Sequence, residues 1–137
     1  MTGILIVTHG DLGKALIDAA GFILGNEPEA VAAISIDLNE KADILRKKIA
    51  QGIDDVKSDG GILILTDMFG GSPSNLSYSF LEEGVVEVLS GVNLPIVLKA
   101  IRGRQQMELS ALAAEIEDYG KKSISLASGI LKGNKSG

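Results

Sequence analysis

The chain has 137 residues, a formal net charge of −5, 45% hydrophobic residues and only 4% aromatic ones. The length predicts one domain over residues 1–130, followed by a flexible tail over residues 131–137. The negative charge argues against a nucleic-acid partner, because phosphate contacts need clustered lysine and arginine. The lack of cysteine excludes disulfides and thiolate chemistry, and a single histidine argues against a typical zinc site. There is no basic N-terminal region before an apolar stretch and no apolar run of membrane-spanning length, which predicts a cytoplasmic protein.

Strand-like and helix-like patterns alternate along the chain. Short apolar runs predict four strands, over residues 4–8, 31–36, 62–65 and 85–89. Apolar residues at helical spacing predict helices over residues 11–24, 39–56, 72–84 and 106–119. Asn39 and Ser72 are predicted N-caps, and Pro73 follows Ser72 at the first helical position.

Two segments are less clear from their residues. Residues 96–101 have strand propensity, but Pro95 just behind a candidate cap at Asn93 favours a helix. The segment Lys122–Ala127 alternates between polar and apolar residues and predicts a short last strand.

The run Ile62–Leu65 is apolar without alternation, which is typical of a parallel strand buried on both faces. Strands that alternate with helices then predict an α/β fold, a three-layer sandwich with right-handed crossovers. Such folds bind ligands beyond the carboxyl ends of the strands, where the strand order reverses. His9 and Asp67 each follow a strand, so a strand order of 2-1-3-4 would place both side chains in one crevice.

His9 is the only histidine, and it stands between the first strand and Gly10. Neutral imidazole is a base and a nucleophile near neutral pH, and a glycine beside it lets a ligand approach the backbone. A lone histidine is more often structural than catalytic. Its position after a buried strand favours a functional role, which makes His9 a candidate catalytic residue.

Asp67 and the residues after it are the candidate partners of His9. In a structural role Asp67 would form a turn; in a functional role it would accept a hydrogen bond from Nδ1–H of His9 and leave Nε2 as the nucleophile. Gly70, Gly71 and Ser72 lead into a helix start, where free N–H groups and the helix dipole suit a phosphoryl group. Ser72 either only caps this helix or also donates its hydroxyl to that group.

Three motifs, in this order, carry a resemblance to a known family. They are Val7–Gly10 after the first strand, Thr66–Pro73 with the pattern D-x-x-G-G-S-P, and Gly91–Pro95 with the pattern G-V-N-x-P. The chain resembles the mannose-family enzyme IIA of the bacterial phosphoenolpyruvate-dependent sugar phosphotransferase system (PTS), and residues 1–130 would form its single IIA domain. The intact Gly-Gly-Ser-Pro run favours this type over the related dihydroxyacetone-kinase subunit.

The resemblance implies a four-stranded parallel sheet in the order 2-1-3-4, with helices on both faces. It also implies a homodimer in which the last strand can cross to the partner's sheet. His9 would be phosphorylated at Nε2 and oriented by Asp67, while Gly10, Gly71 and Ser72 would hold the phosphoryl oxygens without any metal or cofactor. The implied reaction takes the phosphoryl group from phospho-HPr and passes it to a separate enzyme IIB, with membrane contact only indirectly, through a IIC/IID permease.

Two other functions stay open on the sequence alone. In the first, phosphorylation of His9 switches a regulatory binding module in a phosphotransferase system without transport. In the second, His9, Asp67 and Ser72 form a small-molecule hydrolase, although the chain has no nucleophile-elbow signature.

Overall fold

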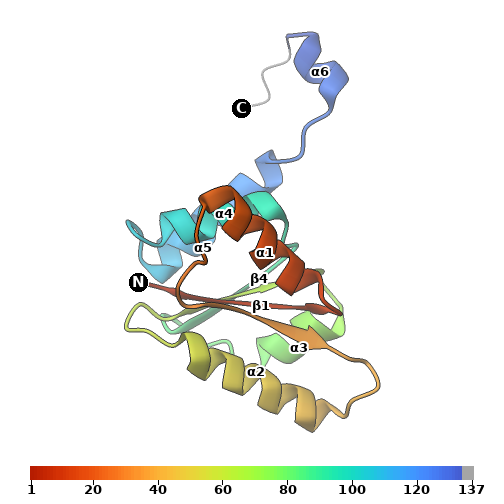
Figure 1. The fold of residues 1–137 in the computed structure, drawn as a ribbon, viewed down its shortest axis with the longest axis vertical. Coiled ribbons are helices and arrows are strands. Elements are labelled where there is room, and N and C mark those ends of the chain that lie inside the picture. The colour runs from red at the N-terminus through yellow and green to blue at the C-terminus, as the bar shows by residue number, and fades with distance from the viewer. Residues whose placement is uncertain (134–137) are drawn as a thin grey trace.

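The computed structural model describes residues 1–133, and its centre is a four-stranded parallel sheet in the order β2-β1-β3-β4 (Figure 1). The strands are β1 (Gly3–His9), β2 (Val31–Ile36), β3 (Ile62–Thr66) and β4 (Val86–Ser90). The helices are α1 (Leu12–Leu24), α2 (Ala42–Val56), α3 (Ser72–Tyr78), α4 (Leu94–Gly103), α5 (Leu109–Lys122) and α6 (Ala127–Leu131). The predicted α/β class and the strand order 2-1-3-4 are confirmed.

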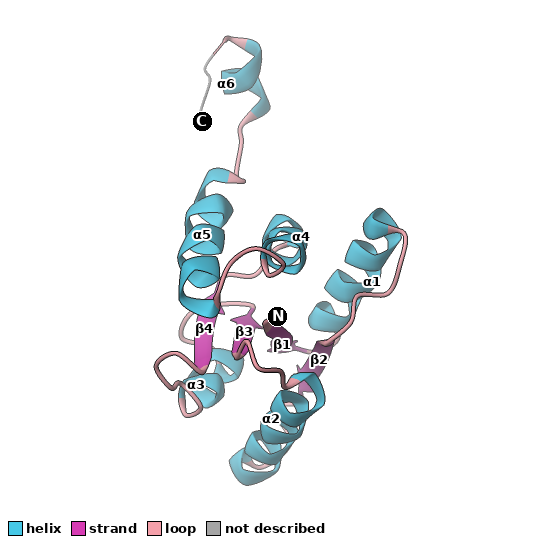
Figure 2. Cartoon of the chain, turned by 90° about the vertical axis from the view of Figure 1, so that its left-hand side faces the viewer, coloured by secondary structure: helices cyan, strands magenta, loops and turns pink. Residues whose placement is uncertain are grey.

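Helices cover both faces of the sheet, as Figure 2 shows, with α1, α4 and α5 on one side and α2 and α3 on the other. Successive residues of a strand point to opposite faces, so Ile4 and Ile6 of β1 pack under the first group while Leu5 and Val7 pack under the second. All four are 0% exposed. This double burial explains why the central strands are apolar without alternation.

The strand order reverses between β1 and β3. From β1 the chain crosses over α1 to β2 at the edge, and from β2 it returns over α2 to β3 on the other side of β1. Val7 of β1 is the register partner of Thr66 of β3. His9 ends β1 and Asp67 directly follows β3, so both lie at the carboxyl ends of adjacent strands, at the switch point where such folds bind ligands.

Two predicted helix caps are wrong by one or two positions. Lys41 rather than Asn39 is the N-cap of α2. Asn39 belongs to the turn before the helix, where its backbone N–H donates to a carboxylate oxygen of Asp37 at 2.9 Å. Gly71 rather than Ser72 is the N-cap of α3, an offset within the range by which helix ends vary.

Of the other helix boundaries, one is as predicted and others are shifted. Asn93 is the N-cap of α4, as predicted, and its Oδ1 accepts from the N–H of Ile96 at 2.9 Å. The ambiguous segment is therefore helical. The predicted helix 72–84 ends early, at Tyr78, and the predicted helix 106–119 begins and ends three residues later, as α5.

The strand predicted over Lys122–Ala127 is wrong for the fold of the single chain. Helix α5 includes Lys122, residues 124–126 have no regular structure, and α6 begins at Ala127. This segment leads away from the sheet (Figure 1), and an alternating sequence forms a strand only where a neighbouring strand is available. Of the predicted tail over 131–137, residues 134–137 lie outside the described part of the chain.

Candidate active site

His9 and Asp67 are in direct contact. Oδ2 of Asp67 accepts a hydrogen bond from the backbone N–H of His9 at 2.9 Å and lies 2.7 Å from its Nδ1. An ionised carboxylate can only accept, so this contact places the ring proton on Nδ1 and leaves the lone pair on Nε2. The side chain of His9 is 38% exposed and that of Asp67 is 12% exposed. The pair therefore presents the Nε2 edge of the imidazole at the surface, while Nδ1 faces the carboxylate.

The carboxylate of Asp67 is held by donors on both oxygens. Oδ2 receives both donors of His9, and Oδ1 accepts from the backbone N–H of Met68 at 2.9 Å. Partial burial raises the pKa of the Asp67 carboxyl, but the hydrogen bonds and the charge interaction with His9 outweigh it, so the net pKa is below its ordinary value. Asp67 is therefore ionised at neutral pH.

The glycine run after Asp67 lets the backbone pack against the imidazole. A Cβ added to Gly71 would lie 3.0 Å from Cε1 and 3.7 Å from Nε2 of His9, so any larger residue would press on the ring. Gly70 has a φ of 85°, a left-handed conformation that favours glycine. Gly71 thus lies beside the Cε1–Nε2 edge of the ring, and the phosphate contact predicted for it stays a prediction.

Ser72 and Gly10, the other two predicted phosphate contacts, differ in what they can offer a ligand. Ser72 is the first residue of α3, one position after the N-cap Gly71. Its hydroxyl therefore lies past the capping position that the sequence assigned to it. Gly10 has a φ of 54° and an open surface, but its N–H donates to the carbonyl of Ile36 at 3.3 Å. Gly10 therefore offers room for close approach rather than a free donor.

Thr8 is a positioning residue that sequence reasoning missed. Its buried hydroxyl accepts from the N–H of Gly13 at 2.9 Å and donates to the carbonyl of Gly10 at 3.2 Å. These bonds tie the end of β1 to the first turn of α1 and so fix the turn that carries His9. A threonine just before the histidine was a local signal, but its partners depend on the conformation of the turn.

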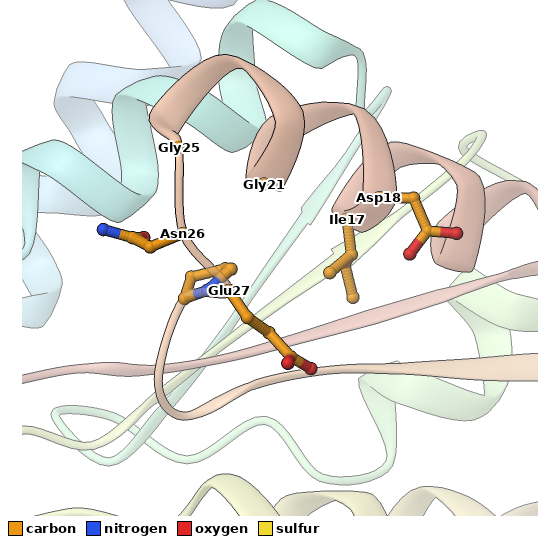
Figure 3. Close-up of a pocket in the computed structure, with 7 residues that line it drawn as sticks. Ile17, Asp18, Gly21, Gly25, Asn26 and Glu27 are labelled. Carbon is orange, nitrogen blue, oxygen red and sulfur yellow. The ribbon is translucent and has the colours of Figure 1, made fainter.

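The cavity in Figure 3 lies apart from these residues. It measures about 440 Å³ and is bounded by α1 and the loop from α1 to β2, with Ile17, Asp18, Gly21, Gly25, Asn26, Glu27 and Pro28 lining it. None of the predicted site residues lines it.

Across residues 1–133, no group of three or more His, Cys, Asp or Glu side chains is placed to hold a metal ion. No described helix is long and apolar enough to cross a membrane.

Comparison with known proteins adds independent information. A family model, EIIA-man, described as "PTS system fructose IIA component", matches residues 3–117. The chain is 31% identical over 129 residues to the PTS system fructose-specific EIIA component of Bacillus subtilis (strain 168), which covers 93% of this chain and 88% of that protein. It is 33% identical over 126 residues to the PTS system mannose-specific EIIAB component of Escherichia coli (strain K12), which covers 88% of this chain and only 39% of that protein.

Solved structures show the same fold. The phosphotransferase system component EIIA from Streptococcus agalactiae matches with a TM-score of 0.82 at 26% identity, over 93% of this chain and 98% of that chain. The PTS IIA protein associated with the fucose utilization operon of Streptococcus pneumoniae matches with a TM-score of 0.83 at 23% identity, over 95% of this chain and 96% of that chain. The resemblance drawn from the three sequence motifs is confirmed. The chain belongs to the mannose family of enzyme IIA components of the sugar phosphotransferase system, and it is a phosphotransferase component of that system.

Proposed function

We propose that this chain is a phosphoryl carrier that accepts the group from phospho-HPr on His9 and passes it to a separate enzyme IIB for sugar uptake. The observation that carries the proposal is the 2.7 Å contact between Asp67 Oδ2 and His9 Nδ1. This contact directs the free lone pair to Nε2, on a ring that is exposed enough for two partner proteins to reach it in turn.

The transfer step balances without any outside reactant. The lone pair of His9 Nε2 attacks the phosphorus of the donor's phosphohistidine. The N–P bond of the donor breaks as the new bond forms, and its electron pair returns to the donor's ring nitrogen. The proton on Nδ1 stays in its hydrogen bond to Asp67, whose negative charge stabilises the positive charge that develops on the ring. Transfer to enzyme IIB is the same step in reverse, with a different acceptor.

Three residues are proposed to accommodate the phosphoryl group. Gly71 leaves free the space beside the imidazole edge that bears Nε2, which a Cβ at this position would approach to 3.7 Å. Ser72 follows it as the first residue of α3, with its hydroxyl past the capping position. Gly10 leaves room at the turn after His9, since a Cβ placed there would meet no atom within 4 Å apart from its chain neighbours.

Labelling with phosphoenolpyruvate, enzyme I and HPr tests this function directly. We expect a phosphoryl group that is labile in acid and stable in base, as for a phosphohistidine. In a chain with one histidine, such a label can only lie on His9. Added enzyme IIB should then remove the label. An acid-stable label would instead indicate a hydroxyl ester and would contradict the proposal, and a label that no enzyme IIB accepts would favour the regulatory alternative.

Partner docking is proposed to use an apolar rim around His9, formed by Leu12, Leu38, Met68 and Phe69. These side chains are 45%, 66%, 55% and 80% exposed. Leu12 is the first residue of α1, just after β1, and the other three lie in the loops that follow β2 and β3, so all four belong to the same edge of the sheet as His9. Exposed aromatic and Met side chains around a reactive group are typical of an interaction surface.

Replacing Phe69 with serine is expected to raise the KM for phospho-HPr about tenfold while kcat changes little, because an exposed aromatic side chain contributes to docking and not to the chemistry. Steady-state phosphorylation kinetics measure both constants. Phe22→Ser is the matched control, because Phe22 is 90% exposed on α1 and outside the rim. An equal rise in KM for both variants, or none for Phe69→Ser, would contradict the docking role.

We also propose a homodimer in which residues 122–127 of the partner pair with the outer edge of β4. Among the described residues β4 is an edge strand of the sheet that pairs with β3, and an isolated antiparallel bridge joins Val86 at its start to Glu82. A groove of about 300 Å³ runs along it and is lined by Glu87, Val88, Leu89, Ser110, Ala113, Ala114 and Glu117. In the single chain Ile124 and Leu126 are 81% and 76% exposed. An open strand edge beside a groove with small side chains is a suitable place for a strand from a second copy.

The double substitution of Ile124 and Leu126 by lysine is expected to convert the dimer to a monomer, because both side chains share one face of an extended segment. Light scattering after size-exclusion chromatography measures the molar mass. The matched control is Ser125→Lys, on the opposite face, which should stay dimeric. A wild-type protein that is monomeric at all concentrations would rule out this assembly.

A further inference from the structure

Three hydroxyl groups from three elements meet behind the loop that follows Asp67. Thr66 ends β3, Ser90 ends β4 as its register partner, and Ser74 lies in the first turn of α3. Ser74 Oγ lies 2.5 Å from Thr66 Oγ1 and 3.0 Å from Ser90 Oγ, and Thr66 donates to Ser90 at 2.9 Å. Thr66 and Ser74 are 0% exposed. We name Thr66, Ser74 and Ser90 the hydroxyl cluster.

A continuous series of hydrogen bonds joins this cluster to the imidazole. The hydroxyl of Ser74 donates to the carbonyl of Met68 at 2.5 Å. The N–H of Met68 donates to Oδ1 of Asp67 at 2.9 Å, and Oδ2 of Asp67 contacts Nδ1 of His9 at 2.7 Å. Both backbone polar groups of Met68 are therefore bound, one by the cluster and one by the carboxylate that orients the histidine.

We propose that the hydroxyl cluster sets the position of the loop Asp67–Gly71, and that Ser74 is the positioning residue through which it holds the Asp67 carboxylate against His9. The inference rests on the proposed function, because the geometry that it preserves is that of a phosphoryl-accepting imidazole. Ser74 itself touches neither the phosphoryl group nor His9.

The other restraints on the loop act further from Asp67: Asn75 Nδ2 donates to the carbonyl of Gly70 at 3.3 Å, and the ring of Phe69 lies 6.4 Å from that of Tyr78. Met68, Phe69 and Gly70 are all exposed and belong to no helix or strand. A displacement of about 1 Å in a catalytic group lowers a rate up to about a hundredfold, so the carboxylate must be held closely. Buried hydroxyls lower stability unless they are bonded, and alanine or valine would fill the same space without that cost. Holding the Met68 carbonyl gives the buried Ser74 hydroxyl a specific role.

Ser74→Ala is the direct test, with two readouts. Nitrogen NMR of the unphosphorylated protein, at a pH where the ring is neutral, should show a smaller share of the Nδ1–H tautomer of His9. The rate of phosphorylation at saturating phospho-HPr should fall about tenfold.

Ser77→Ala is the matched control. Ser77 lies on the same helix, is 0% exposed, and donates to the carbonyl of Pro73 at 2.6 Å. Its removal should lower stability by a similar amount and leave the tautomer ratio and the rate unchanged. A second pair of variants distinguishes the effect of the Thr66 hydroxyl from the effect of its side-chain volume. Thr66→Val keeps the volume but loses the hydroxyl, and it should slow transfer. Thr66→Ser keeps the hydroxyl, and it should retain most of the rate.

The outcomes distinguish this inference from the function on which it rests. Wild-type tautomer ratios and rates in both Ser74→Ala and Thr66→Val would overturn the positioning role while the phosphoryl carrier stood. Equal effects of Ser74→Ala and Ser77→Ala would overturn it too, because they would reflect a general loss of structure. If the wild-type protein accepted no phosphoryl group, the carrier function would fail, and the tautomer readout would still decide whether Ser74 positions Asp67.

Discussion

Replacing His9 with alanine is expected to abolish labelling by phosphoenolpyruvate, enzyme I and HPr completely. His9 is the only histidine, and no cysteine is present to replace it as a nucleophile. The loss should be in chemistry and not in folding. The imidazole lies at the end of β1 and is 38% exposed, so its removal should change the free energy of unfolding by only about 1 kcal/mol. Denaturant titration beside the labelling assay measures both quantities.

His9→Gln is the companion variant, because glutamine keeps a polar group near Asp67 without a ring nitrogen. It should also fail to accept the label. Full labelling of either variant would remove His9 from the mechanism. If His9→Ala lost both the label and the folded state, its result would not test the chemical role of His9. His9→Gln is the less disruptive change, and its labelling would then decide that role.

Replacing Asp67 with asparagine is expected to slow phosphoryl transfer about a hundredfold without removing the site of transfer. In the wild type, one oxygen accepts from His9 and the other from Met68. An asparagine has only one oxygen. If its NH₂ faces His9, it favours the tautomer with the proton on Nε2; if its NH₂ faces Met68, two donors meet and the loop shifts. Quenched-flow labelling measures the rate, and NMR of the ring nitrogens measures the tautomer.

Asp11→Asn is the matched control for charge, because Asp11 is an exposed carboxylate two residues from His9 that contacts Ser35 instead. It should transfer at nearly the wild-type rate, and an unchanged rate in Asp67→Asn would exclude Asp67 from the mechanism.

Acid unfolding of the wild type and of Asp67→Asn gives a second readout. The pKa of Asp67 is lower in the folded protein than in the unfolded chain, where it is about 4. The ionised carboxylate therefore stabilises the fold above about pH 4, and this contribution is lost as the pH falls through the folded-state pKa. The wild type should therefore lose more stability than Asp67→Asn below about pH 4.

Local patterns were sufficient for the four strands of the sheet, for most of the helices and for one cap. Four strands and the helices between them follow from runs and spacings that lie within single segments. Asn93 was predictable as a cap because its partner, the N–H of Ile96, is only three residues away. Asn39 failed because it lies in the turn that starts at Asp37, two residues before the N-cap Lys41. The segment Lys122–Ala127 failed because a strand depends on a neighbour that periodicity does not specify.

The sequence by itself determined which residue types follow each strand, and so placed a histidine after β1 and an aspartate followed by glycines after β3. Only the tertiary structure decided that these residues meet. Asp67 contacts His9 because β1 and β3 are adjacent in the sheet, and strand order follows from crossovers and shared burial over the whole domain. The hydroxyl cluster depends on tertiary packing in the same way. Thr66, Ser74 and Ser90 are ordinary in their own segments, and they form one unit only where β3, β4 and α3 pack together.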